Sequence, residues 1–234
     1  MSESNRPPHD GEPYGPGPID DQEWPERFVA RAVGPGPDPT LHGYSIFEDL
    51  IPNYNASERA LTAFLGEAPN EDQIRRFDLA CGLASVVHVG DAPVHASVLA
   101  SVVGARPENT LGLGATVLAE QARHDIDRHA ALIAHFNDGP RYTQPERPST
   151  SLAPLIAGLK RLNLESQAPK LARSLTGAAI ALFCEVGLTA RKQLAAALVW
   201  ARFPTLAAEA IATSPGGLLR YPLDTPGYRY TEEE

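Results

Sequence analysis

The densest group of chemically active side chains in the sequence is His124-Asp125-Ile126-Asp127-Arg128-His129. Residues four apart share one face of a helix, so His124 lies above Arg128 and Asp125 lies above His129. One interpretation places His124 and Arg128 on an inward face, where a histidine can exchange a proton near neutral pH. The alternative is the solvated end of a helix that carries local ion pairs.

A second group of candidate side chains surrounds a Gly-Asp-Ala-Pro turn and consists of His88, Asp91 and His95. Imidazole and carboxylate are ligands that suit zinc or iron. Their spacing crosses a break between helices and matches no known metal motif. The sequence therefore favours helix caps and partly buried histidines at this turn, and we expect no bound metal.

The sequence offers few other nucleophiles. Its two cysteines, Cys81 and Cys184, each lie in an apolar stretch with helical periodicity. Free, buried thiols in a reducing cytoplasm are the expected state, and no disulfide is predicted. No G-x-S-x-G motif occurs, and Gly216-Gly217 lacks the Lys-Ser/Thr pattern that follows a phosphate-binding loop.

Composition narrows the class of protein. The 234 residues carry a formal net charge of −9, and 43% of them are hydrophobic. Nucleic-acid binding is not expected, because Lys and Arg are not clustered. No apolar run reaches the roughly 18–20 residues that span a bilayer, and the N-terminus lacks a secretory signal. We therefore expect a cytoplasmic protein with a core of its own and no membrane partner.

Most of the basic residues are arginines, and only Lys160, Lys170 and Lys192 are lysines. The planar guanidinium group suits fork-like recognition of a carboxylate or a phosphate. The alternative explanation for the bias is a GC-rich genome.

The elements that position these side chains are almost wholly helical from Leu41 onward. Asn70, with a glutamine three residues on, is a capping-box start, and Pro93 suits the first turn of the next helix. Gly187 and Pro204 are predicted to separate neighbouring helices. The predicted helices cover residues 57–65, 70–90, 93–104, 107–136, 151–163, 166–184, 189–203 and 205–213. No strand longer than a few residues is expected, so the predicted fold class is all-α.

Three regions follow from this pattern. Residues 1–40 contain many Pro and Gly residues and are predicted to be a disordered or extended arm. Residues 41–215 form the helical domain, and residues 216–234 form an extended tail. Gly112 and Gly114 weaken the start of a long helix by about 1 kcal/mol each, which suggests close packing at that point.

Several segments, taken in order, resemble motifs of one known family. Residues 41–51 (LHGYSIFEDLI) are similar to its “RGYDIEDLI” segment, and residues 61–70 (LTAFLGEAPN) are similar to “YLLLTGELP”. Residues 88–97 stand where the family has “ADHGLTPSALAAR”. Residues 178–182, with Gly187-Leu188 and the helix to Phe203, are similar to “GAIAALLLDLGLPPELGRALFVIAR”. The chain thus resembles a short, divergent member of the citrate synthase and citryl-CoA lyase superfamily.

This resemblance covers about residues 24–213 and includes Trp24, which falls where small family members carry a tryptophan. It implies a citrate-synthase-like helical fold, reduced in size, that binds no cofactor and takes a CoA thioester as substrate. In the family a carboxylate removes the proton from the α-carbon of the thioester, and a neutral histidine stabilises the enolate oxygen. A second histidine serves the carbonyl of the acid, and arginines hold its carboxylates.

The family's catalytic positions carry over only in part. Counting without gaps from the Pro93 turn places the “PLHG” histidine on His124, which is followed here by Asp125 and not by glycine. The “NVDG” segment that supplies the carboxylate base aligns with residues 174–177. Thr176 stands in place of the aspartate, and a threonine cannot act as that base unaided.

The family's second histidine has no direct counterpart. Val89 occupies its place in the “DH” turn, and the neighbouring candidates are His88, His95 and Asp91. Residues 136–150 contain nothing like the family's “PGFGH” segment. These departures leave open whether the chemistry differs, is supplied by other residues or is lost.

The resemblance implies that Arg123, Arg128 and Arg220 bind the acid substrate. The first hypothesis is a cytoplasmic enzyme that forms or cleaves the bond next to an acyl-CoA thioester, acting as a transferase or a lyase. It would be a homodimer packed through helices 93–104 and 108–136. The alternative is a non-catalytic or regulatory subunit that pairs with a larger, full-length homologue, and a third option is an unrelated helical scaffold.

Overall fold

The structure, a computed structural model, describes residues 32–34, 36–139 and 151–213. Trp24 and most of the predicted arm lie outside the described residues. So do segment 140–150 and the predicted tail that contains Arg220.

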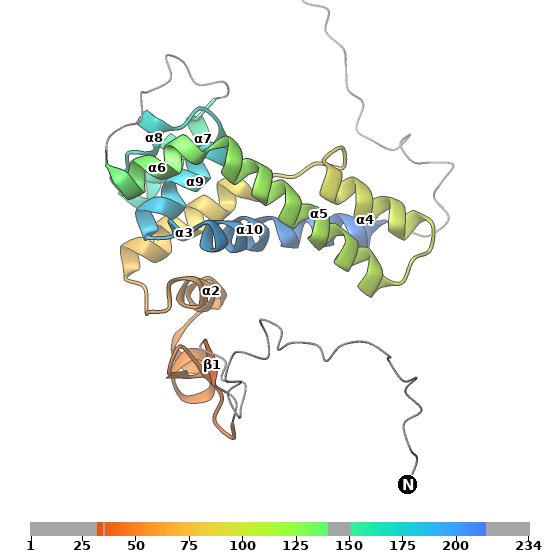
Figure 1. Cartoon of the computed structure of the whole chain (residues 1–234), viewed down its shortest axis with the longest axis horizontal. Coiled ribbons are helices and arrows are strands. Elements are labelled where there is room, and N and C mark those ends of the chain that lie inside the picture. The colour runs from red at the N-terminus through yellow and green to blue at the C-terminus, as the bar shows by residue number, and fades with distance from the viewer. Residues whose placement is uncertain (1–31, 35, 140–150, 214–234) are drawn as a thin grey trace, which may run out of the picture.

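Helices make up most of the described residues (Figure 1). The elements are β1 Val33–Gly34, β2 Thr40–Leu41, β3 Tyr44–Ser45, the π-helical turn η1 Ile46–Leu50, α1 Ile51–Asn53, α2 Ala56–Leu65, α3 Glu71–Ala84, α4 Ala92–Val102, α5 Pro107–Arg128, α6 Ala130–Asp138, α7 Ala153–Leu162, α8 Ala168–Leu171, α9 Leu175–Val186 and α10 Arg191–Ala212. The short strands pair antiparallel in the order β1-β2-β3. The all-α prediction is confirmed.

Capping boxes account for the starts of α2 and α3, and a proline lies in the first turn of α4. The Asn70 side chain accepts a hydrogen bond from the backbone N of Gln73 at 2.9 Å, and the Gln73 side chain accepts one from the backbone N of Asn70 at 2.9 Å. Asn55 and Glu58 form the same capping box before α2. Pro93 lies in the first turn of α4. These reciprocal bonds satisfy N–H groups that a helix leaves unpaired at its start.

Two helices that the sequence predicts as continuous are split. The predicted helix 107–136 breaks at His129, whose φ of −104° and ψ of 16° separate α5 from α6. The predicted helix 166–184 is divided into α8 and α9, because Ser174 is extended and its Oγ caps the backbone N of Gly177 at 3.0 Å. Both breaks place a polar side chain between helices.

The ends of two further helices differ from the prediction. Helix α3 ends at Ala84 and not at Gly90, and the free carbonyl of Ala84 accepts a hydrogen bond from Arg202 Nε at 3.2 Å. Helix α10 continues through Pro204, where a break was predicted. A proline inside a helix costs roughly 3 kcal/mol, and here the helix keeps Leu206 buried beyond it.

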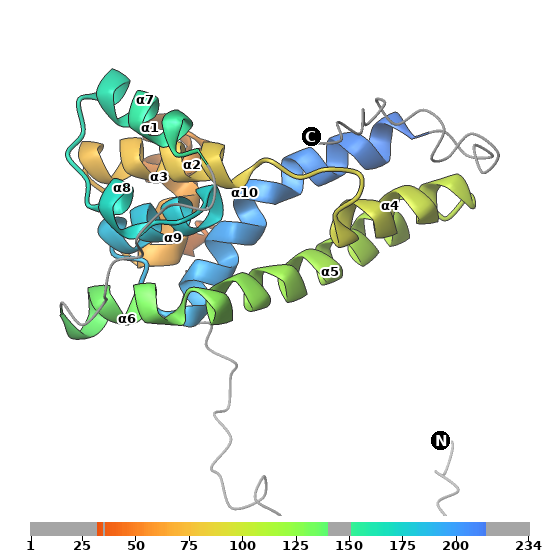
Figure 2. The same ribbon diagram turned by 90° about the horizontal axis from the view of Figure 1, so that it is seen from above.

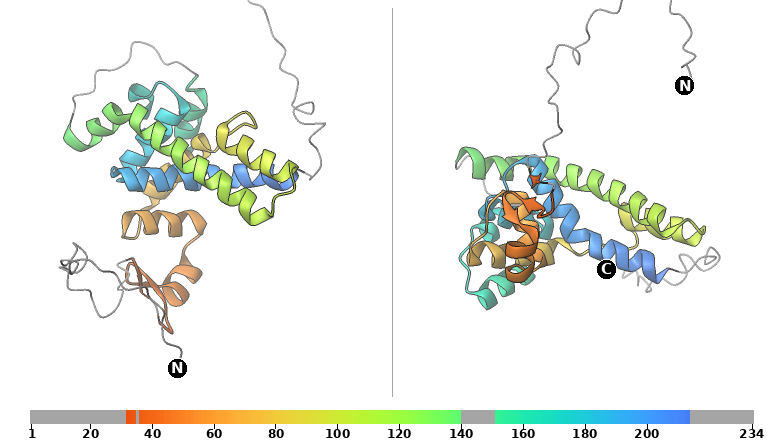
Figure 3. Two further views of the ribbon diagram at one scale, coloured as in Figure 1. Left: turned by 45° about the vertical axis from the view of Figure 1, so that its right-hand side comes forward. Right: turned by 90° about the horizontal axis from the view of Figure 1, so that it is seen from below.

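The helices form two connected parts. Helices α3 and α9 pack along each other in the compact part, with α6, α7 and α8 around them (Figure 1). Helix α4, helix α5 and the C-terminal half of α10 lie side by side and extend away from it (Figure 2). The sheet, η1 and α1 lie at one end, beyond α2 (Figure 3).

Each part has its own core. Helix α9 is buried on all sides in the larger one, from Gly177 to Cys184. The smaller core consists of Val94, Val98, Val102, Leu118 and Leu206. Helix α5 contributes to both, because Ala122 and Ile126 belong to the larger core.

Helix α10 is also long and apolar enough to span a bilayer when only length and composition are considered, although the sequence analysis expected no such run. Its Leu194, Leu198 and Leu206 are buried against the other helices, and so is Arg202. Over the whole 18-residue apolar window, 39% is buried inside the structure.

The two glycines early in α5 make a matched pair for testing the packing of the smaller core. A Cβ built on Gly114 would lie 2.0 Å from Ser97 Oγ and 2.9 Å from Leu206 Cδ2, whereas one built on Gly112 meets nothing within 4 Å. We expect Gly114→Ala to lower the free energy of unfolding by about 1–3 kcal/mol. Gly112→Ala should raise it by up to about 1 kcal/mol. Urea unfolding followed by circular dichroism measures both, and equal effects would contradict this packing.

Candidate functional site

His129 lies at the break between α5 and α6 and faces the first turn of α9. His129 is half-buried, and its Nδ1 lies 2.8 Å from the carbonyl oxygen of Asp125. A carbonyl oxygen only accepts, so Nδ1 is the donor in this contact. In the neutral ring the proton is therefore on Nδ1, and Nε2 carries the lone pair.

The Nε2 side of this ring faces the first turn of α9. A Cβ built on Gly177 would lie 3.0 Å from His129 Nε2 and 3.1 Å from its Cδ2. Glycine at this position thus allows the imidazole to approach the backbone of the helix. Thr176, half-buried, lies in the same turn. The structure therefore brings His129 together with segment 174–177, which resembles the segment of the family that supplies its base.

A buried ion pair supports the end of α5. Arg202 Nη1 donates to Asp125 Oδ2 at 2.7 Å, and the two side chains are only 6% and 16% exposed. Arg202 Nε also donates to the carbonyl of Ala84. Among the described residues, Arg202 is the only charged residue in the buried class. The pair links the ends of α3 and α5 to α10, and it fixes the residue whose carbonyl orients His129.

The interpretation that places His124 and Arg128 on an inward face of α5 is wrong. His124, Arg123 and Arg128 are all exposed. The buried residues of α5 include Leu118, Ala122 and Ile126, and this phase of the helix turns Asp125 and His129 toward the protein and His124 away from it. A catalytic role for His124 stays a prediction.

The outer face of α5 carries the local ion pairs of the alternative interpretation. Arg123 lies 2.9 Å from Glu120 and 3.5 Å from Asp127, and Arg191 of α10 donates to Asp127 at 2.5 Å. The hydrogen bond from Arg191 lowers the pKa of Asp127.

The other predicted site residues do not gather around His129. His88 and His95 are exposed. Asp91 shapes the turn, since its Oδ2 accepts from the backbone N of His88 at 2.7 Å and its own N donates to the carbonyl of His88 at 2.8 Å. In the described parts of the chain, no three His, Cys, Asp or Glu side chains are placed to hold a metal ion. Arg220 lies outside the described residues.

Comparison with solved structures identifies the architecture. Citryl-CoA lyase from Hydrogenobacter thermophilus matches with a TM-score of 0.60 over 88% of this chain and 96% of that chain, at 15% sequence identity. The chain has the citryl-CoA lyase fold. The match covers most of both chains, so the two proteins have folds of similar size.

A second solved structure contains this fold within a longer chain. ATP citrate lyase from Methanothrix soehngenii, in complex with citrate and coenzyme A, matches with a TM-score of 0.51 at 13% identity. The match covers 100% of this chain and 47% of that chain. A scan against protein-family models and a search of curated proteins by sequence gave no match. At these identities the likeness establishes the citryl-CoA lyase fold and leaves the activity to experiment.

His129 was predicted only as a member of the polar cluster 124–129, and neither it nor Arg202 was among the predicted site residues. Counting without gaps reached His124, five residues before the histidine at the helix break, because nothing in the local pattern marks α5 as ending at Arg128. A signal for Arg202 was present, since it interrupts the apolar run from Leu194 to Phe203. Its partner, Asp125, is 77 positions away in sequence and is set by tertiary packing.

Substitution of Arg202 tests whether the Arg202–Asp125 ion pair supports the end of α5. Arg202→Met would leave the Asp125 carboxylate largely buried without a partner, and we expect it to lower the free energy of unfolding by about 3–5 kcal/mol. Arg123→Met on the exposed face should change it by less than about 0.5 kcal/mol. The double variant Asp125→Leu/Arg202→Met should recover part of the loss. Urea unfolding checks all three, and similar losses for Arg202→Met and Arg123→Met would contradict the assignment.

Neither cysteine is poised as a nucleophile. Burial, with a smaller contribution from Asp78, raises the pKa of Cys81 to about 12. Burial, with a smaller contribution from Glu185, likewise raises the pKa of Cys184 to about 12. Both thiols are free, as the sequence predicts.

The raised thiol pKa values give a pH-dependent prediction. Thiols of the unfolded chain ionise from about pH 8.5, whereas Cys81 and Cys184 stay protonated up to about pH 12. Stability from this source is complete below about pH 8.5 and falls as pH rises, by at most about 1.4 kcal/mol per pH unit for each thiol. A thiolate-specific reagent at pH 8 should react with neither thiol in the folded chain and with both in urea. Fast reaction of the folded chain would refute this.

Proposed function

We propose that this chain is an acyl-CoA carbon–carbon lyase that cleaves a carboxylate-bearing 3-hydroxyacyl-CoA into a shorter CoA thioester and an oxo-acid. The observation that carries the proposal is the placement of His129, whose Nε2 side faces the first turn of α9. The citryl-CoA lyase fold supports it, and the complex of ATP citrate lyase with citrate and coenzyme A supports the choice of substrates.

The orientation of His129 suits the role of a general base. In the family, a neutral histidine that stabilises an enolate oxygen must donate a hydrogen bond. In this chain the Nδ1–H of His129 is given to the Asp125 carbonyl, so the neutral ring presents an acceptor at Nε2. An acceptor at this point is suited to remove a proton from a hydroxyl group.

Cleavage then proceeds in balanced steps. His129 Nε2 takes the proton of the hydroxyl on the β-carbon, and the electron pair left on that oxygen forms the new carbonyl. The bond between the α- and β-carbons breaks, and its electron pair enters the thioester as an enolate. The protonated ring returns its proton to the α-carbon. The products are an oxo-acid and a shorter acyl-CoA, and no cofactor takes part.

The first turn of α9 stabilises the charge that develops. The N-terminal end of a helix carries a partial positive charge that favours an anion, and the Thr176 hydroxyl can donate a hydrogen bond to the enolate oxygen. Thr176 cannot serve as the carboxylate base that condensation requires. In the proposed steps His129, and not a carboxylate, exchanges the proton with the α-carbon, and by microscopic reversibility this holds for cleavage and for condensation alike.

The test compares two histidines on the same helix. Purified chain is incubated with citryl-CoA, and acetyl-CoA release is followed by mass spectrometry. We expect His129→Asn to lower kcat at least 100-fold, the typical range for loss of a general base, while His124→Asn stays within a few-fold of wild type. The reverse result would support the sequence-based assignment to His124. No turnover of citryl-CoA or of other carboxylate-bearing 3-hydroxyacyl-CoA thioesters would overturn the enzyme proposal.

A second candidate function is a non-catalytic subunit that pairs with a larger homologue. Thr176 in place of the aspartate favours it, because the parent reaction needs that carboxylate. Calorimetry with acetyl-CoA and with CoA separates the two candidates. A dissociation constant near the micromolar range, about −8 kcal/mol, favours the enzyme, and no binding by the chain alone favours the subunit. The homodimer and the cytoplasmic location stay predictions.

A further inference from the structure

Ser174 brings a hydroxyl group to the same place as the His129 imidazole. A Cβ built on Gly177 would lie 3.3 Å from Ser174 Oγ and 3.0 Å from His129 Nε2. The two distances together limit the separation of Oγ and Nε2 to about 6 Å, a gap that one water molecule can bridge. Both side chains are half-buried. The end of α5 and the start of α9 thus place a hydroxyl and an imidazole on either side of one point.

The proton of the Ser174 hydroxyl is available to a base. Ser174 is the N-cap of α9, and its Oγ accepts a hydrogen bond from the backbone N of Gly177 at 3.0 Å. A hydroxyl group has two acceptor lone pairs and one O–H donor, so this contact leaves the proton unused. Among the described residues, no acceptor takes it. No G-x-S-x-G motif marks this serine, because the neighbouring histidine comes from a different helix.

His129 has the tautomer that a base for this proton requires. Its Nδ1–H is held by the carbonyl of Asp125 at 2.8 Å, which leaves the lone pair of Nε2 for the proton of a nucleophile. An activated serine is recognised by a base within reach and by a third group that orients the base. Here these groups are His129 and the Asp125 carbonyl. Catalytic contacts of this kind are often long until the substrate is bound, and in this structure Ser174 and His129 form no direct hydrogen bond.

The start of α9 also supplies donors for an oxygen on which negative charge develops. A helix leaves the N–H groups of its first turn without partners inside the helix. Ser174 pairs with that of Gly177, and within the described residues those of Leu175 and Thr176 have no acceptor. They directly follow Ser174, as the N–H of an oxyanion hole directly follows a serine nucleophile. The partial positive charge at the start of the helix adds to their effect.

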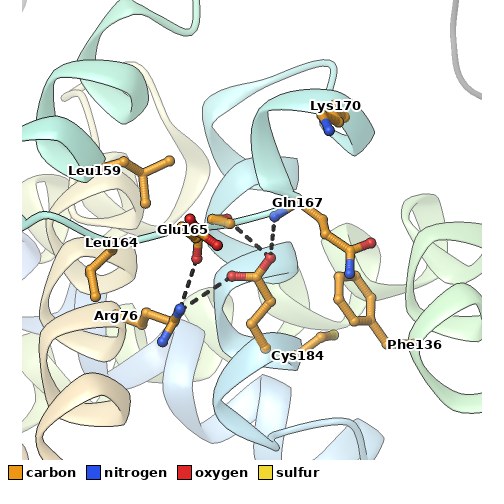
Figure 4. A pocket seen from close by; sticks show the side chains of 10 residues that line it. Arg76, Phe136, Leu159, Leu164, Glu165, Gln167, Lys170 and Cys184 are labelled. Atoms are coloured by element: carbon orange, nitrogen blue, oxygen red, sulfur yellow. Dashed lines mark hydrogen bonds and ion pairs between the residues drawn. The ribbon is translucent and has the colours of Figure 1, made fainter.

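The charged groups of a pocket at the other end of α9 pair with one another. This pocket has a volume of about 990 Å³, and Arg76, Glu165 and Glu185 are among its lining residues (Figure 4). Arg76 lies 3.6 Å from Glu185 and donates to the carbonyl of Glu165. Glu185 also accepts hydrogen bonds from Ser166 and from the backbone N of Gln167. The chemistry at α9 is therefore assigned to its first turn.

We infer that Ser174 and His129 form a nucleophile–base pair that hydrolyses acyl-CoA thioesters. The choice of a CoA thioester as the substrate rests on the proposed function. The pair itself rests on the positions of the two side chains around Gly177 and on the orientation of the imidazole. Hydrolysis of the thioester goes beyond the lyase reaction, because it breaks the bond between carbon and sulfur and leaves the carbon–carbon bonds intact.

Hydrolysis proceeds through an acyl-serine in balanced steps. Ser174 Oγ attacks the carbonyl carbon of the thioester while its proton moves to His129 Nε2, and the carbonyl oxygen becomes an oxyanion. The carbon–sulfur bond breaks, and the sulfur of CoA leaves with the proton from the ring. A water molecule then attacks the acyl-serine and gives a proton to Nε2. The ester bond to Oγ breaks, and Oγ takes that proton back. The products are CoA and a carboxylic acid, and water is the co-reactant.

The first experiment measures hydrolysis of acetyl-CoA and of p-nitrophenyl acetate by the full chain. Free CoA is followed by mass spectrometry and p-nitrophenol by absorbance. We expect Ser174→Asn to lower both rates at least about 100-fold, because asparagine keeps the N-cap of α9 and has no nucleophile. His129→Asn should lower them by a similar factor. Ser85→Asn is the matched control and should stay within a few-fold of wild type, since Ser85 is also half-buried and its hydroxyl donates to the carbonyl of Gly82 at 2.9 Å.

The results for the two esters decide the inference. Unchanged rates in Ser174→Asn would overturn it, and so would the absence of both CoA and p-nitrophenol with the wild type. Hydrolysis of p-nitrophenyl acetate without release of CoA would overturn the thioester as the substrate.

Acetyl-CoA separates this inference from the proposed lyase function, because it has no β-hydroxyl group from which the lyase reaction could start. Release of CoA from acetyl-CoA without cleavage of citryl-CoA would support the inference and count against the lyase. Cleavage of citryl-CoA without release of CoA from acetyl-CoA would do the reverse.

A cysteine at the position of the serine provides a readout that does not depend on turnover. A thiol beside a histidine at the start of a helix has a lowered pKa and reacts faster. We expect iodoacetamide at pH 7 to alkylate Ser174→Cys at least about tenfold faster than Ser85→Cys, and His129→Asn added to Ser174→Cys to remove most of the difference. The native Cys81 and Cys184 do not interfere, because their pKa is raised to about 12. Equal rates for the two cysteine variants would contradict the placement of the pair.

Discussion

The burial of α9 on every side is the constraint on which the rest of the structure depends. A helix that is apolar all round must be surrounded by other helices, and α3, α6, α8 and α10 provide this cover. Polar groups can then reach α9 only at its ends. His129 meets its first turn, and the Arg76–Glu185 pair meets its last. Both polar contacts follow from this division of one helix into an apolar middle and two polar ends.

The Asp125–Arg202 pair adds direction to this packing. Apolar contacts alone would permit α5 and α10 to slide past each other, whereas a charge-assisted hydrogen bond of 2.7 Å requires one register. Burying two charges costs free energy, and such a pair is weak evidence for stability. We regard its role as specificity: it holds the residue whose carbonyl orients His129.

Much of the fold was predictable from the sequence, because local chemistry decides it. The capping-box residues Asn70 and Gln73 predict the start of α3. The citrate-synthase-like motifs predict the architecture that the comparison with citryl-CoA lyase confirms. Local chemistry failed where distant contacts decide. Helix α10 continues through Pro204 with Arg202 and Leu206 buried on either side of it, and α5 ends at Arg128, where His129 leaves the helical conformation. A catalytic role for His124 stays a prediction, and Arg202 was not among the predicted site residues because its partner lies far away in the chain.

Helix α5 contributes residues to both cores and so connects them rigidly. Its 22 residues extend over about 33 Å, with Gly114 seated on Ser97 and Leu206 near one end and His129 directly after the other. Packed helices move as rigid bodies, so small rotations at one end become displacements at the other. A tilt of α5 by a few degrees at the end that packs on α4 and α10 would shift the imidazole by about 1–2 Å. A displacement of that size is on the order of the tolerance of a reacting group. The packing of α4, α5 and α10 is thus connected through α5 to the position of the imidazole.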